Sequence, residues 1–222
     1  MFVGHYAAAL ALKRSKPEAS LGFLFIAVQL VDIIFFPSVL WGIEKLTIVK
    51  NYTAATHFKL DFMPYTHSLT AAFVWAGLTY LLFRFLPLFK SVNRNIIAIV
   101  MALAVLSHWF LDLIVHTPDL PLWIGDSPTI VGLGLWQSAG GTYAAEAFLL
   151  IIGLGLYMTS TKATCSAGKY GMPVFVLVLL VFNGLNIFAP PIYDTTLFLS
   201  ISSLLVYFFA AASGFWLDKK RV

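Results

Sequence analysis

The sequence predicts an all-α fold, a polytopic membrane helical bundle of about six transmembrane helices with a short N-terminal half-helix before them. Hydrophobic residues make up 60% of the 222 residues and charged residues only 11%, and the mean hydropathy is +0.88. A soluble domain carries about 25% charged residues, so the charges here are too few to cover a surface that faces water. The apolar residues also fall into runs close to the ~20 residues that a helix needs to cross a bilayer.

The first apolar stretch, residues 2–12, has about half the length needed for a crossing and ends at the basic residues Lys13 and Arg14. A signal peptide has the inverse order, with its basic residues before the apolar stretch. We therefore expect a short helix that dips into the bilayer. Longer apolar runs follow and predict spans at residues 20–42, 68–89, 95–116, 143–161, 172–189 and 195–217.

The basic residues predict the orientation of these spans. Clusters of Lys and Arg fall on one side, at Lys13, Arg14, Lys16, Lys90, Arg94, Lys162, Lys169, Lys219, Lys220 and Arg221. By the positive-inside rule, both termini are then cytoplasmic. Loop 117–142 has no Lys or Arg and is expected on the outer side, whereas loop 43–67 carries lysines and is placed outside only by the alternation of the spans. These clusters account for the net charge of +4, so no nucleic-acid partner is expected.

The chain contains no internal repeat, which predicts a single integral membrane domain over residues 1–222. Residues 1–120 are expected to bear the functional site because most of the ionisable residues inside predicted spans lie there. Residues 121–222 are expected to supply an outer loop and mainly scaffold helices.

The third predicted span contains three ionisable residues, His108, Asp112 and His116, each four positions from the next. This spacing places them on one face of a helix. An Asp at the centre of a membrane helix costs about 2.5 to 3.5 kcal/mol, so it needs a partner or a purpose. A His and an Asp at this spacing can bind one cation together, or the carboxylate can orient the imidazole. The alternative is a proton-sharing pair that stabilises a helix interface.

Further polar residues lie inside the predicted spans or at their ends: His5 in the half-helix, Asp32 in the first span, His67 at the start of the second, and Glu146 in the fourth. Counted inward from the span ends, most of them fall in the outer half of the bilayer with the group in the third span, which predicts one shared site. For His5 alone, the favoured interpretation is a core residue bonded to Gln29 or to a backbone carbonyl.

The remaining acidic and histidine residues considered as candidates, Glu44, His57, Asp61, Asp126 and Asp194, lie in predicted loops and are expected to be solvated. The single cysteine, Cys165, excludes a zinc site built from cysteines. Any metal is therefore expected to be held by histidines and carboxylates.

Four short elements appear in order: Gly4-His5, Asp32 in the first apolar helix, Thr66-His67-Ser68-Leu69, and Ser107-His108-xxx-Asp112. Their order resembles the membrane-bound metal-dependent hydrolases, which include the LexA-binding inner-membrane-associated hydrolase family, and it covers roughly the first 120 residues. The resemblance implies a bacterial inner-membrane protein with a metal site at His5, Asp32, His67, His108 and Asp112. The chain departs from the family at Asp32, where one carboxylate stands in place of a Pro-Asp-x-Asp type of cluster.

Together these features predict a metal-dependent hydrolase that cleaves a lipid-like ester or phosphodiester with water activated by a divalent metal ion, zinc first. Glu146 and His116 are the expected catalytic residues, with the Glu146 carboxylate moving the proton and His116 at the outer water path. The expected partners are the lipid bilayer and a membrane-embedded or lipid-like substrate, with the oligomeric state left open.

The same residues allow three other functions. A transporter or a proton or cation relay would use the buried His and Asp residues, although repeated halves are not evident in the sequence. A b-type haem protein would use two histidines as axial ligands, and the carboxylates beside them argue against it. A non-catalytic structural membrane protein would use the polar residues to fasten its helices together.

Overall fold

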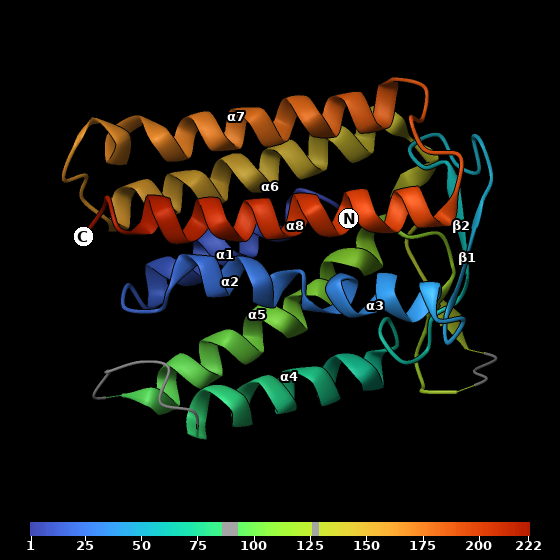
Figure 1. Cartoon of the computed structure of the whole chain (residues 1–222), viewed down its shortest axis with the longest axis horizontal. Coiled ribbons are helices and arrows are strands. Elements are labelled where there is room, and N and C mark those ends of the chain that lie inside the picture. Colours follow the sequence, from blue (N-terminus) through green and yellow to red (C-terminus); the bar gives the residue numbers. More distant parts are fainter. Residues whose placement is uncertain (86–92, 126–128) are drawn as a thin grey trace.

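The computed structural model describes residues 1–85, 93–125 and 129–222, which form a bundle of helices with a small strand hairpin at one end (Figure 1). The helices are α1 (Gly4–Ser15), α2 (Leu21–Val28), α3 (Leu30–Leu40), α4 (Leu69–Phe85), α5 (Arg94–Val115), α6 (Ala139–Ser160), α7 (Ser166–Phe188) and α8 (Thr196–Asp218). The predicted all-α helical bundle is confirmed.

Among the described residues, α5, α6, α7 and α8 are long and apolar enough to cross a membrane. They correspond to the predicted spans at 95–116, 143–161, 172–189 and 195–217. Helix α4 is apolar but shorter, with 17 residues, and the end of its predicted span at 68–89 lies outside the described residues. Four long apolar helices are typical of a membrane protein.

The predicted span at 20–42 is broken into α2 and α3, which meet at an angle of 49°. The break falls at Gln29, whose backbone has φ −108° and ψ 5° and whose buried side chain donates to the Phe2 carbonyl at 3.3 Å. A helix end leaves backbone carbonyls without a partner further along the helix. The carbonyl of Val28, the last residue of α2, is therefore available to a side chain from another helix.

Helix α1 lies inside the bundle, in contact with α2, α5 and α6 (Figure 1). Its close approach to α6 depends on Gly153, because a Cβ atom there would lie 2.8 Å from the Ala7 carbonyl oxygen. Apolar residues of α1, α2, α5, α6 and α7, including Leu10, Phe25 and Met101, form the main hydrophobic core around it. The expected short N-terminal helix is thus a buried element of the bundle.

One end of the bundle, called the hairpin end below, is covered by the antiparallel strands β1 (Lys45–Ile48) and β2 (Phe58–Phe62) (Figure 1). A second short pair, β3 (Leu120–Pro121) and β4 (Ile130–Val131), and a 3-10 turn, η1 (Leu135–Gln137), follow α5. Both segments are loops in the sequence-based prediction. Their ordered backbone positions the residues that lie between the spans.

Candidate metal centre

A cluster of four histidines and two aspartates lies between the middle of the bundle and the hairpin end. It is called the His/Asp cluster and consists of His5 from α1, Asp32 from α3, His67 just before α4, His108 and Asp112 from α5, and His116 at the end of α5. Asp32 is the most accessible member, with 15% of its side chain exposed, while the others are buried. All five predicted metal ligands are therefore neighbours, and His116 joins them.

Helix α5 presents its three members on one face, as the spacing of four predicts. His108 Nε2 lies 3.0 Å from Asp112 Oδ2, and His116 Nε2 lies 3.6 Å from the same oxygen. The Asp112 carboxylate therefore lies between the two rings.

The other members approach the α5 group from separate parts of the chain. His67 Nε2 lies 3.2 Å from Asp32 Oδ1 and 4.0 Å from Asp112 Oδ2. His5 Nε2 lies 3.2 Å from Asp112 Oδ1, and the His5 ring stacks on the His108 ring with centroids 3.8 Å apart. The expected bond from His5 to Gln29 or to a backbone carbonyl is not present among the described residues. His5 instead belongs to the cluster.

Two overlapping triads within the cluster can hold a metal ion: His5, Asp32 and His108, and His67, His108 and Asp112. In each triad, one ligand atom per residue lies within 4.8 Å of the others. Ligands at ~2.05 Å around a tetrahedral zinc ion are ~3.3 Å apart. The N···O distances of 3.0 to 4.0 Å in the second triad bracket that separation. Because both triads use His108, they describe alternative ligand sets around one position.

The outer nitrogen of His108 has a fixed partner. Its Nδ1 lies 2.7 Å from the carbonyl oxygen of Val28, at the break between α2 and α3. A carbonyl only accepts hydrogen bonds, so Nδ1 must carry the proton. In the neutral ring, Nε2 then carries no proton, and its lone pair faces the Asp112 carboxylate.

His67 and His116 have the same arrangement. His67 Nδ1 lies 2.8 Å from the Thr66 hydroxyl, which donates its own hydrogen to Glu44 Oε2 at 2.7 Å and so must accept from the ring. His116 Nδ1 lies 2.8 Å from Asp119 Oδ1, which also accepts. Both rings therefore point an Nε2 lone pair inward when they are neutral.

Nε2 lone pairs that face carboxylate oxygens repel them unless a cation lies between. His108 Nε2 and both His5 nitrogens have no hydrogen-bond partner within the part of the chain that the structure describes, although each ring is buried. Outer hydrogen bonds that fix the tautomer and direct the other nitrogen inward are typical of metal-binding histidines. The buried cluster can thus hold a metal ion, with protons on the rings and the Met1 amino group beside Asp112 as the other sources of positive charge.

The expected solvation of Glu44 and His57 is wrong. Glu44 is 2% exposed, and it accepts from the Thr66 hydroxyl and from the backbone N–H groups of Tyr65 and Thr66 at 2.7 to 3.0 Å. His57 is also buried, and its Nδ1 accepts from the Asn51 N–H at 3.0 Å. Both side chains are covered because the hairpin folds back over the bundle. Asp61 and Asp194 are exposed, as predicted, and Asp126 lies outside the described residues.

Glu146 is held at the start of α1. Its Oε2 accepts from the backbone N–H groups of Phe2 and Gly4, each at 3.0 Å, and so supplies partners that the first turn of a helix lacks. Beside it, the amino group of Met1 pairs with Asp112. The expected role of Glu146 as a proton carrier stays a prediction, and the structure adds a contact through which it positions α1.

The cluster also has a contact that the sequence did not predict, Tyr207. The Tyr207 hydroxyl, from α8, donates to Asp32 Oδ2 at 3.0 Å. Thr66 and Glu44 were missed as partners of His67 for a similar reason, since uncharged and loop residues give no signal comparable to an ionisable residue inside a span. Tyr207 therefore connects the cluster to the half of the chain that was expected to be scaffold.

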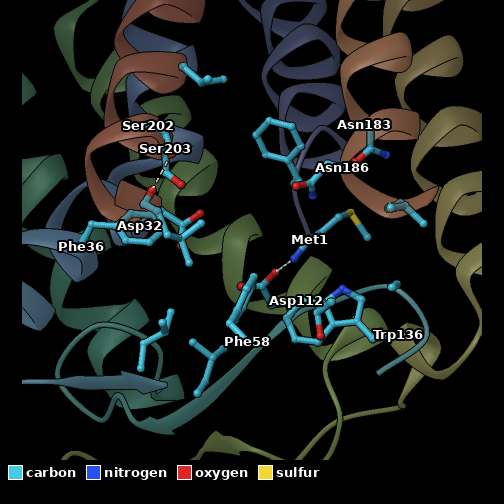
Figure 2. Close-up of a pocket in the computed structure, with 18 of the residues that line it drawn as sticks. Met1, Asp32, Phe36, Phe58, Asp112, Trp136, Asn183, Asn186, Ser202 and Ser203 are labelled. Carbon is cyan, nitrogen blue, oxygen red and sulfur yellow. Dashed lines mark hydrogen bonds and ion pairs between the residues drawn. The ribbon is translucent and has the colours of Figure 1, made fainter. Parts of the chain in front are cut away.

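The cluster opens into a cavity of about 170 Å³ (Figure 2). Apolar side chains such as Phe35, Phe36, Phe58 and Leu199 form most of its walls, and Asp32, His67, Asp112, His116 and Glu146 lie on its surface. Figure 2 shows Asp32 and Asp112 on the cavity between Phe36, Phe58 and Met1. A polar centre is thus exposed to a space that fits an apolar group.

Comparison of the chain with protein-family models, with curated proteins and with solved structures gave no match. The geometry of the His/Asp cluster and the cavity is therefore the basis for a functional assignment.

Proposed function

We propose that this protein is a metal-dependent membrane hydrolase that cleaves a lipid-like ester or phosphodiester. The observation that carries the proposal is the set of three histidines, His67, His108 and His116, whose outer nitrogens are all held by acceptors. Their inner nitrogens meet two carboxylates at the surface of an apolar cavity. The resemblance of the short motifs to membrane-bound metal-dependent hydrolases supports the same assignment.

In this proposal His67, His108 and Asp112 hold a divalent ion, with Asp32 or His5 completing the set. Zinc is the first choice because histidine nitrogens and aspartate oxygens are ordinary zinc ligands. When bound there, such an ion acts as a Lewis acid and makes water a nucleophile at neutral pH.

The proton transfer falls to His116 in the first instance. Its Nδ1 is held by Asp119 and its ring lies on the cavity, an arrangement that suits a general base. For a carboxylic ester, water adds to the acyl carbon, the bond to the alcohol oxygen breaks, and the proton that His116 took from water passes to that oxygen. Glu146 positions the start of α1, and with it His5. Glu146 is also a second candidate for the group that carries the proton, and Glu146→Gln tests this role.

We further propose a bacterial inner-membrane location with both termini cytoplasmic. This orientation places the hairpin end, and so the cavity, toward the outer side of the membrane. The run of basic residues at the other end of the bundle supports it.

A proton relay is the second candidate, and one observation favours it. Hydrogen bonds and ion pairs connect Glu44 through Thr66 and His67 to Asp32 and on to Tyr207. Beyond the cluster, however, the opposite half of the bundle is filled by the apolar core around Leu24, Ile97 and Leu150, which interrupts a path across the membrane.

The test is the metal content of the detergent-purified protein. The wild type is expected to hold metal in stoichiometric amount, and His108→Ala and Asp112→Ala are expected to lose it. His57→Ala is the matched control, because His57 is the histidine outside the cluster and should leave the metal content unchanged. If the folded wild type contains no metal and takes up none from zinc, manganese or iron, the hydrolase assignment is wrong and a relay becomes the better candidate.

A further inference from the structure

The far wall of the cavity carries uncharged polar side chains where α7 and α8 meet it. They are Asn183 and Asn186 from α7 and Ser202 and Ser203 from α8 (Figure 2). The hydrolase mechanism does not use them. They come from the part of the chain in which the sequence predicts mainly scaffold helices.

Asn183 is the most informative of them. Its side chain is on the cavity surface and the residue is 1% exposed, yet neither its Oδ1 nor its Nδ2 has a hydrogen-bond partner among the described residues. Buried amides are almost always paired, because an unpaired polar group loses its hydration without compensation. A buried amide at the cavity wall whose Oδ1 and Nδ2 are both unpaired indicates that something else supplies the partners.

The cavity also reaches the surface of the bundle beside these residues. Phe182 and Ile192 line it and are 42% and 82% exposed, and Asn186 is exposed as well. Neighbouring apolar side chains on the outer faces of α7 and α8, such as Leu185 and Leu205, are more than half exposed, as expected for helices that face lipid. An apolar chain can therefore enter from the side of the bundle.

The charge of the cavity restricts the polar part of such a ligand. Among the described residues that line it there is no Lys or Arg, and the Met1 amino group there is paired with Asp112, while Asp32, Asp112 and Glu146 are acidic. An anionic headgroup at the Asn183 wall would find no cationic side chain to bind it. Amide and hydroxyl groups instead suit an uncharged group that both donates and accepts hydrogen bonds.

We propose that Asn183, with Asn186 and Ser203, binds the uncharged glycerol-type headgroup of a single acyl-chain lipid that enters beside α7 and α8. The inference rests on the proposed function, because the lipid is a substrate only if the His/Asp cluster hydrolyses esters. The ester bond of the bound lipid would lie between the Asn183 wall and the cluster. The inference narrows the substrate class from esters and phosphodiesters in general to carboxylic esters of neutral lipids.

Direct binding tests this without hydrolysis. Radiolabelled hexadecyl glyceryl ether, which has no ester to cleave, is measured on the purified full chain against the same ether carrying a phosphate monoester. The neutral ether should bind the more tightly. Asn183→Leu, which keeps the approximate size but removes the amide, should weaken its binding roughly tenfold.

Two further variants guard against misfolding and against general effects on α8. Asn186→Leu changes an exposed position and should weaken binding severalfold while the fold is retained. Ser200→Ala is the matched control, because Ser200 is a buried serine of α8 with an unpaired hydroxyl that does not line the cavity within the described chain. It should bind the ether as the wild type does.

The outcomes separate this inference from the proposed function. Equal ether binding by wild type and both asparagine variants, tighter binding of the phosphate form, or no ether binding at all overturns the inference, whatever the metal content. A chain without metal that still binds the ether through Asn183 overturns the hydrolase assignment and leaves the lipid site standing.

Discussion

Two groups of charged residues, one at the end of the bundle away from the hairpin and the other toward the hairpin end, are satisfied in opposite ways. At the end away from the hairpin, Arg221 donates to the carbonyl oxygens of Met158, Thr161 and Gly168 and to the Thr161 hydroxyl at 2.6 to 3.2 Å. Nearby, Lys13 pairs with Asp218 at 2.7 Å. We call Lys13, Asp218 and Arg221 the terminal ion group.

In the His/Asp cluster the balance is different. The outer nitrogens of His67, His108 and His116 are as well bonded as the Arg221 guanidinium, but their inner nitrogens face acceptors. A group whose donors all meet acceptors inside the chain is structural, whereas one that gathers acceptors around a common point can hold a cation. Burial of charged groups therefore does not by itself indicate a binding site. The balance between donors and acceptors distinguishes a binding site from a structural ion group.

The largest effect that sharpens this comparison is expected at Arg221. Arg221→Met removes the guanidinium and leaves its buried carbonyl partners unpaired, so the free energy of unfolding should fall by about 3 kcal/mol. Thermal denaturation in detergent measures the loss, and the metal content of the protein that remains folded should equal that of the wild type. A variant that unfolds no earlier than the wild type but loses its metal would contradict the division between the two groups.

A smaller effect is expected at Thr66, which acts on the cluster through His67. Thr66→Val keeps the shape but removes the hydroxyl that accepts from His67 Nδ1. Loss of such an outer partner reduces metal affinity about tenfold. Competition with a chelator measures the affinity, and Thr70→Val serves as a control because Thr70 bonds to Ser68 and Ile124 instead of to a cluster ring. An unchanged affinity in Thr66→Val would mean that His67 does not bind the ion.

The smallest effect is expected at Tyr207. Tyr207→Phe removes one hydrogen bond to Asp32 Oδ2, and the neighbouring rings still surround that carboxylate. Metal affinity should change by no more than about threefold, and hydrolysis, once a substrate is available, by up to about tenfold. A complete loss of metal in this variant would show that Asp32 depends on Tyr207 for its position and is a required ligand.

The sequence predicted which polar residues lie together better than it predicted the path of the chain around them. His108, Asp112 and His116 were placed correctly because helical spacing alone puts them on one face, and Asp32 because a carboxylate among Ile and Phe residues must face inward. The proximity of His5 depends on how α1 packs against α5 and α6, which no local pattern reports.

The break at Gln29 and the burial of Glu44 could not be predicted for a different reason. A long apolar run predicts one span whether or not the helix bends, because the composition is the same in both cases. The bend breaks only a few backbone hydrogen bonds, which other groups replace. Glu44 lies in a segment with the composition of a loop, and only the hairpin that folds over the bundle encloses it. Asn183 was overlooked because an uncharged amide hardly interrupts an apolar helix.

The residues of the two triads come from distant parts of the chain, and this affects how the bundle assembles. His5, Asp32, His67 and His108 come from four separate segments, spread over more than a hundred residues of sequence. An ion that binds the packed bundle but not the separated helices shifts their equilibrium toward packing by mass action, in proportion to the logarithm of its free concentration. If the cluster holds an ion, that ion also holds these segments together, and a chelator is expected to lower the thermal stability of the bundle.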